Sequence, residues 1–158
     1  MKSILLLTLA AAWISGCVTA LPPTLSLWDA AERGKVEVVR QHLAAGTDVN
    51  ARGGITGLTA LHQAAFHGRE KIAALLIEAG ADVNAAGRRG ETPLHSTVYW
   101  EHRAIAELLL TNGAALGAKL ENGQTPLEWA EQLGASSMAD LFRNHGLNGE
   151  NSRGGQSD

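Results

Sequence analysis

The stretch TALHQAAFHGR, residues 59–69, decides the fold because its pattern recurs at a fixed spacing. TPLHSTVYWEH begins at Thr92 and TPLEWAEQLGA begins at Thr125, so the three copies start 33 residues apart. The segment LWDAAERGKVEVVRQHL, residues 27–43, has the same layout without a preceding loop. A fixed period of this length is typical of repeat architectures, and the chain therefore contains four copies of one structural unit.

A second motif stays in phase with the first. AAGTDVN begins at Ala44, EAGADVN at Glu78 and TNGAALG at Thr111, at steps of 34 and 33 residues. The longer first step places one extra residue in the loop 51–56. Because two separate motifs recur together, the whole unit is repeated and not only one helix of it.

Local chemistry predicts a short helix at the start of each unit. The threonine that opens each copy accepts a hydrogen bond from the first amides of a helix. Pro93 and Pro126 follow this threonine at a position where a missing amide costs nothing. Leu61, Ala64 and Ala65 then share one face of the helix. Small alanines on this face allow the next helix to approach closely.

The second half of each unit predicts another helix and a turning connection. Ile72, Leu75 and Leu76 form one apolar face, and Gly80 closes the helix after its last turn. The segment ADVNAAGRRGE, residues 81–91, contains glycines where a turn needs positive φ. Each unit is therefore expected to consist of helix, turn, helix and hairpin.

This unit resembles the ankyrin repeat, down to the TPLH and AGADVN motifs. The resemblance covers roughly residues 25–147 and implies an all-α solenoid of about four helix-turn-helix units with β-hairpin-like connecting loops. It also implies that the first helices and the hairpin tips face the concave side. The expected unit boundaries are 25–58, 59–91, 92–124 and 125–147, with a disordered tail at 148–158.

Some positions depart from the repeat pattern. Glu101 stands where the other units have a helix-ending glycine, so we expect a strained or reshaped turn there. Gln41 and His42 replace apolar residues of the second helix, which suits a half-exposed first unit. The last unit has a polar outer face, as terminal repeats need.

The first residues predict an export signal. Lys2 precedes an apolar run from Ile4 to Ile14, which is shorter than the roughly 20 residues that span a bilayer. The stretch ISGC, which ends at Cys17, resembles the bacterial lipobox. In lipoproteins the cysteine sulfur carries a diacylglyceryl group and cleavage precedes the cysteine, which implies a lipoprotein signal peptide at 1–16 and a lipidated tether at 17–24.

The competing interpretation is cleavage after Ala20, where VTA offers small residues to a general signal peptidase and would release a soluble periplasmic protein. Lipidation is expected to hold the domain at a membrane, because each buried methylene contributes about 0.8 kcal/mol. Val18 is not the aspartate that signals inner-membrane retention in many lipoproteins. By that resemblance, the protein is expected on the outer membrane, facing the periplasm.

Composition excludes several function classes. The chain has 13 basic and 16 acidic residues, a formal charge of −3 and no block of like charge, which argues against nucleic-acid binding. A single cysteine forms no intramolecular disulfide. His62 and His95 lie in the TALH and TPLH motifs, where the family uses histidine for hydrogen bonds at the helix start. No catalytic or metal-ligating pattern is visible, so we expect a monomer without a cofactor and without enzymatic activity.

The remaining function is recognition of another protein. In ankyrin proteins, partner contacts concentrate on hairpin tips and on the last residues of each first helix. The matching positions chosen here are Arg33, Phe66, His67, Arg88, Arg89, Glu91, Tyr99, Trp100, Gln132 and Leu133. The alternative for Phe66 or Tyr99 is that the ring only covers a neighbouring helix. The expected roles are an immunity protein that blocks a toxin or a scaffold for an envelope enzyme, and the rival of a different class is an enzyme.

Overall fold

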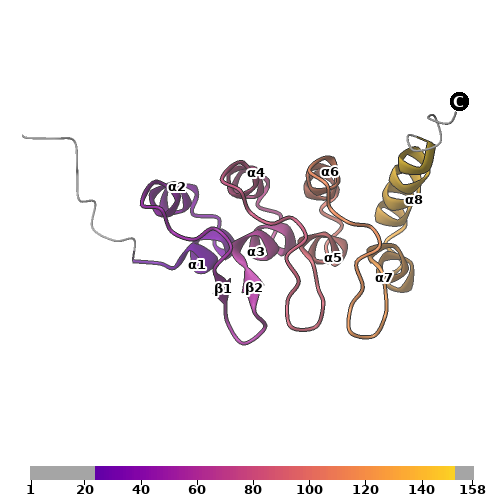
Figure 1. Ribbon diagram of the computed structural model, residues 1–158, viewed down its shortest axis with the longest axis horizontal. Coiled ribbons are helices and arrows are strands. Elements are labelled where there is room, and N and C mark those ends of the chain that lie inside the picture. The colour runs from indigo at the N-terminus through magenta and orange to yellow at the C-terminus, as the bar shows by residue number, and fades with distance from the viewer. Residues whose placement is uncertain (1–23, 152–158) are drawn as a thin grey trace, which may run out of the picture.

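The computed structural model describes residues 24–151, which form a row of helix pairs (Figure 1). The first helices of the pairs form one row and the second helices form another (Figure 1). The pairs are α1 (Leu27–Glu32) with α2 (Val36–Ala44), α3 (Ala60–Phe66) with α4 (Glu70–Glu78), α5 (Pro93–Val98) with α6 (Arg103–Thr111), and α7 (Pro126–Leu133) with α8 (Ser136–Asn151). The predicted all-α solenoid of four units is confirmed.

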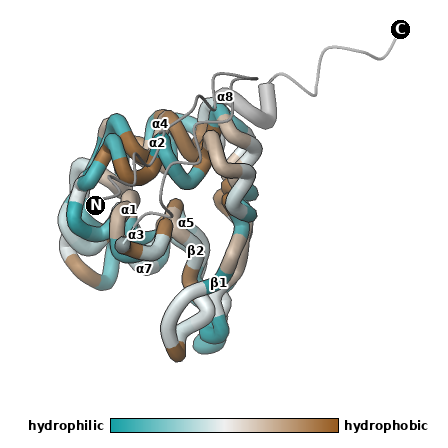
Figure 2. Tube along the Cα trace, turned by 90° about the vertical axis from the view of Figure 1, so that its left-hand side faces the viewer, coloured by the Kyte–Doolittle hydropathy of each residue, from teal (hydrophilic) through white to brown (hydrophobic). Residues whose placement is uncertain are grey.

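Hairpins connect successive units and project away from the first helices. Seen along the row, the first helices and the hairpins form two arms with an open angle between them (Figure 2). The first hairpin contains the short antiparallel strands β1 (Arg52–Gly53) and β2 (Leu58–Thr59). Neighbouring hairpins are joined through their backbones, because the Arg88 amide donates to the Thr56 carbonyl at 2.9 Å and the Glu121 amide to the Arg89 carbonyl at 2.7 Å.

Helices α3, α5 and α7, which open the second, third and fourth units, each begin with a capping box. The Thr59 amide donates to Nδ1 of His62 at 3.1 Å, and the Thr92 amide donates to Nδ1 of His95 at 3.3 Å. In α7 a carboxylate takes the place of the histidine as acceptor, since the Thr125 amide donates to Oε2 of Glu128 at 2.8 Å. These bonds satisfy amides that a helix leaves without an internal partner.

The core is mainly aliphatic and rich in alanine. Ala64, Ala65 and Leu94 are fully buried, and α3 packs between α1 and α5. Because the first helices carry alanine on their inner faces, the second helices pack closely onto them.

Asparagines link the units at the base of the hairpins. Oδ1 of Asn50 accepts from the Asp82 amide, and Oδ1 of Asn84 accepts from the Ala115 amide, both at 2.8 Å. The amide group of Asn84 also donates to the Gly113 carbonyl at 3.0 Å. Each asparagine side chain therefore binds backbone groups just after the second helix of the following unit.

The turn at Glu101 keeps the conformation of the glycine turns. Glu101 has a φ of 50°, and it is the sole residue other than glycine with positive φ in the part of the chain that the structure describes. The expected strain is therefore borne by the backbone of one residue, and the turn is not reshaped.

The domain boundaries differ in one place from the sequence-based expectation. Helix α8 continues to Asn151, four residues beyond the predicted end of the repeats at 147. Gly146 lies inside this helix, and its φ is not in the positive range that Gly46, Gly80 and Gly113 adopt at the ends of the other second helices. Residues 152–158 of the predicted tail lie outside the described residues, as do the signal peptide 1–16 and Cys17.

Candidate functional site

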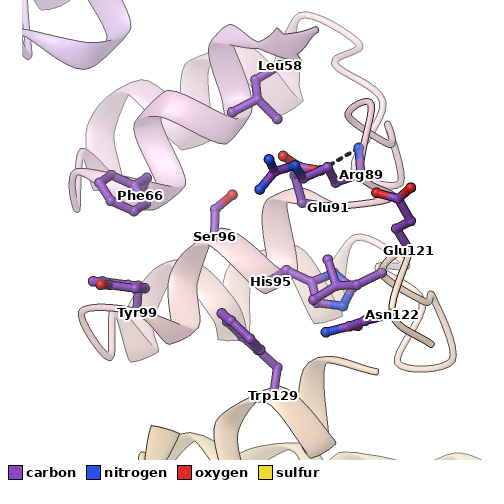
Figure 3. A pocket seen from close by; sticks show the side chains of 11 residues that line it. Leu58, Phe66, Arg89, Glu91, His95, Ser96, Tyr99, Glu121, Asn122 and Trp129 are labelled. Atoms are coloured by element: carbon purple, nitrogen blue, oxygen red, sulfur yellow. Dashed lines mark hydrogen bonds between the residues drawn. The ribbon is translucent and has the colours of Figure 1, made fainter. Parts of the chain in front are cut away.

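A groove of about 620 Å³ lies between the row of first helices and the hairpins (Figure 3). Its walls come from all four units, from Leu58 at the end of the first to Trp129 in the last, so no single unit forms it. The lining residues are Leu58, Phe66, Arg89, Glu91, His95, Ser96, Tyr99, Leu120, Glu121, Asn122 and Trp129.

Aromatic side chains continue along one edge of this groove. The ring centroids of Phe66 and Tyr99 are 5.8 Å apart, and those of Tyr99 and Trp100 are 5.5 Å apart. His67 extends the series, with its ring 5.0 Å from Phe66. We refer to His67, Phe66, Tyr99 and Trp100 as the aromatic row. The spacings are those of favourable tilted and edge-to-face ring pairs.

The aromatic row lies at the ends of α3 and α5, where the helices turn toward their partners. Phe66 is half-buried, whereas Tyr99 is 56% and Trp100 is 61% exposed. A core role for Trp100 is therefore excluded. Tyr99 both contacts Phe66 in the neighbouring unit and leaves more than half of its surface to solvent, so covering a helix is not its whole role.

The hairpin wall of the groove carries its charged side chains, beside the apolar Leu58 and Leu120. The Arg89 amide donates to Oε2 of Glu91 at 2.9 Å, and the Glu91 carbonyl accepts from Nε2 of His62 at 3.0 Å. Glu91 is half-buried, whereas Glu121 is exposed on the next hairpin. The groove therefore has its large aromatic side chains on the helices and its charged side chains on the hairpins.

His62 and His95 are structural and neutral. Burial lowers the pKa of His62 to about 4 and also lowers the pKa of His95. Nδ1 of His62 accepts from the Thr59 amide, so Nε2 carries the proton and donates to the Glu91 carbonyl. Since both ring nitrogens are occupied, this histidine connects a helix start to the next hairpin and is not available for proton transfer.

The structure brings together four of the ten predicted binding residues. Phe66, Tyr99, Arg89 and Glu91 line the groove. The other six do not line it: His67 and Trp100 belong to the aromatic row, and Arg33, Arg88, Gln132 and Leu133 lie at helix ends or in a hairpin.

Some of the others have partners of their own. Nε2 of His67 lies 4.0 Å from Oε1 of Glu32. Gln132 accepts a hydrogen bond from Gln124, and Leu133 is 44% exposed at the end of α7.

Sequence reasoning missed Ser96, Leu120 and Trp129 as groove residues. Trp129 lies on α7, three and four residues before Gln132 and Leu133, which were chosen. Because residues three and four apart share a helix face, this spacing could have revealed it. Leu120 lies in a hairpin, where no periodicity indicates which side faces the groove.

The residues that the structure describes contain neither a metal-binding cluster nor a helix that could span a membrane. Within residues 24–151, His, Cys, Asp and Glu side chains do not gather in threes that could hold a metal ion. None of the helices described there has the length and apolar character needed to cross a bilayer. The absence of a cofactor stays a prediction.

Comparisons with known proteins agree with the geometry. A family model described as ankyrin repeats in three copies matches residues 27–120. An ankyrin repeat-containing protein of Schizosaccharomyces pombe is 39% identical over 69 residues, which are 44% of this chain and 33% of that protein. The chain thus spans about a third of the length of this curated relative.

Proposed function

The chain belongs to the ankyrin-repeat family, and from that membership we propose that it is a membrane-anchored, periplasmic module that binds another protein through its groove. Ankyrin repeats form non-catalytic scaffolds for protein–protein interaction. The mechanism is therefore recognition by a rigid surface, without a chemical step. The tether at 17–24 would confine this surface to the membrane.

The observation that carries the proposal is the exposed aromatic row. Tyr99 and Trp100 are more than half exposed beside an aromatic-lined groove. Large aromatic side chains dominate the free energy of protein interfaces when a partner covers them. A stack of units with such a surface on its inner side supports binding of a folded protein or a protein segment.

Anchoring through Cys17 is supported by the ISGC motif after a short apolar run. Mass spectrometry of the N-terminal peptide from envelope fractions tests it directly. A lipidated Cys17 is expected, and Cys17→Ala should leave an unprocessed precursor or redirect cleavage to Ala20. An unmodified mature chain that begins at Leu21 in wild-type cells would contradict the anchor and favour the soluble alternative.

The Trp100→Ala variant tests the binding surface. Central aromatic anchors lose about 2 kcal/mol or more of binding free energy on truncation, roughly thirtyfold in affinity. We expect the variant to lose this affinity for a partner that the wild-type protein captures from an envelope extract. Its folding should change by far less than the 3–5 kcal/mol typical of a buried tryptophan.

Arg40→Ala is the matched control, because Arg40 is a large exposed side chain on α2, outside the groove. It should bind the captured partner normally. Unfolding of Trp100→Ala, or normal binding by it, would show that the aromatic row is not the interface. The captured partner then separates the two roles: an immunity protein inactivates it, whereas a scaffold leaves it active.

A further inference from the structure

Arg89 brings a positive charge into a groove whose other lining residues are apolar, neutral polar or acidic. It lines the groove, and its side chain runs from the hairpin toward the helix wall near Ser96 (Figure 3). Among the described residues, the ion pairs involve Arg40, Arg103, Arg143 and His67, and none involves Arg89. Its guanidinium therefore presents its donors without a carboxylate partner from this part of the chain.

The carboxylates of the groove are placed differently. Oε2 of Glu91 accepts a hydrogen bond from the backbone amide of Arg89. This bond ties the Glu91 carboxylate to its own hairpin turn. Glu121 is exposed on the hairpin between α6 and α7. The helix wall of the groove consists of Phe66, His95, Ser96, Tyr99 and Trp129. None of them adds a charge at neutral pH, because burial lowers the pKa of His95.

We propose that the groove takes a segment of a partner protein in which a large apolar side chain stands next to a carboxylate. The apolar side chain would lie against the rings of Phe66, Tyr99 and Trp129. The carboxylate would accept hydrogen bonds from the Arg89 guanidinium, whose planar donors match both oxygens of a carboxylate. This inference rests on the proposed function, since it names the kind of segment that the same groove recognises.

Arg88 provides a built-in comparison. It is the neighbour of Arg89 in sequence and has the same charge, but it does not line the groove. Its side chain lies beside Gly57 of the preceding hairpin, where a Cβ on that glycine would come within 3.4 Å of Cγ. A property of the groove should therefore depend on Arg89, whereas a general effect of positive charge should depend on both arginines.

Three blocked pentapeptides with the sequence Gly-X-Phe-X-Gly serve as probes, with X as Glu, Gln or Lys. They are titrated into the ¹⁵N-labelled full chain in mild detergent, and binding is followed at the indole N–H of Trp129 and the amides of Ser96 and Tyr99. We expect the Glu peptide to bind about three- to tenfold more tightly than the Gln peptide, and the Lys peptide to bind most weakly. About 1 M salt should reduce this preference.

Arg89→Gln should lower the affinity for the Glu peptide to that for the Gln peptide, and Arg88→Gln should retain the preference. Equal binding of the Glu and Gln peptides by wild-type protein would overturn the inference. A preference for the Lys peptide, or an equal effect of both arginine substitutions, would also overturn it. The same holds if the NMR signals of the groove residues do not shift when peptide is added. The proposed function is judged on a separate result, the capture experiment with Trp100→Ala, so the two failures are distinguishable.

Discussion

At the scale of single residues, Glu101 shows how one unit can replace a glycine. A Cβ on Gly34 would come within 3.2 Å of the Arg69 side chain, and a Cβ on Gly68 would come within 2.5 Å of the His102 ring. The repeat places Ala135 at the corresponding position beside Glu101. The short alanine removes the steric obstacle, so only the cost of a positive φ remains.

Glu101→Gly should therefore stabilise the protein. Positive φ costs a residue with a Cβ about 1–2 kcal/mol, part of which the greater entropy of glycine in the unfolded chain offsets. We expect a gain of about 0.5–1 kcal/mol in the free energy of unfolding, measured with urea. Glu107→Gly, in the interior of α6, should have the opposite sign, and a loss of stability in both variants would contradict the strain at Glu101.

His62 couples folding to pH. Its pKa is lowered to about 4 by burial, against about 6.5 for the unfolded chain, so the unfolded state binds the proton more readily. The contribution of neutral His62 to stability is fully present above pH 6.5. It is lost as the pH falls from 6.5 toward 4, by at most about 3 kcal/mol, because protonation of Nδ1 breaks the bond from the Thr59 amide.

His62→Gln should flatten this pH dependence. Glutamine at this position of a capping box accepts the Thr59 amide but does not titrate. Urea unfolding between pH 7.5 and 4.5 should show a smaller loss of stability than in the wild-type protein. The matched control is His145→Gln, at an exposed position on α8, which should retain the wild-type slope; an unchanged slope in His62→Gln would show that another group is responsible.

At the scale of elements, α8 differs from the other second helices in how it ends. Gly46, Gly80 and Gly113 have φ values of 73°, 87° and 87° and close α2, α4 and α6. Gly146 occupies the same place in the repeat but stays in the helix. One sequence position thus has two conformations, and the presence of a following unit distinguishes them.

Alanine substitutions at Gly113 and Gly146 should have opposite signs. Gly113→Ala forces a Cβ into positive φ and should cost about 1–2 kcal/mol. Gly146→Ala removes a flexible residue from a helix and should add about 0.5–1 kcal/mol, because the new Cβ meets only Leu116 at 3.8 Å. Thermal and urea unfolding measure both changes. Destabilisation by Gly146→Ala would show that the helix ends at this glycine in solution.

At the scale of the whole molecule, stability comes from the contacts between units. Helix α3 packs against α1 and α5, so an inner unit buries apolar surface on both sides, whereas the first and last units do so on one side. The inner units should consequently open least often, and their amides should exchange with solvent most slowly.

Leu94→Ala tests this dependence on stacking. Leu94 is fully buried in the third unit, and its truncation should cost about 3–5 kcal/mol. Hydrogen exchange should become faster in α3 and α7 as well as in α5. Leu108→Ala, at a half-buried position on α6, should cost much less, and acceleration confined to α5 would contradict the coupling between units.

The sequence by itself determined the fold of this protein. Period, threonine caps and helix-ending glycines are local features, and each unit needs only its neighbours to bury its apolar face. The same local positions marked Phe66, Tyr99, Arg89 and Glu91 as candidate partner contacts, and these four line the groove. Exposure of Trp100 could also be predicted, because the turn between two helices faces solvent in every unit.

The tertiary structure alone decided which of these residues share one site. Trp129, Leu120 and Phe66 come from three different units, and only their stacking places them around one groove. It also decided that Arg89 reaches into the groove while Arg88 lies against Gly57, since hairpin side chains follow no period that a sequence displays. The physical reason is that local propensities are set within a few residues, whereas a surface formed by several units depends on how those units pack.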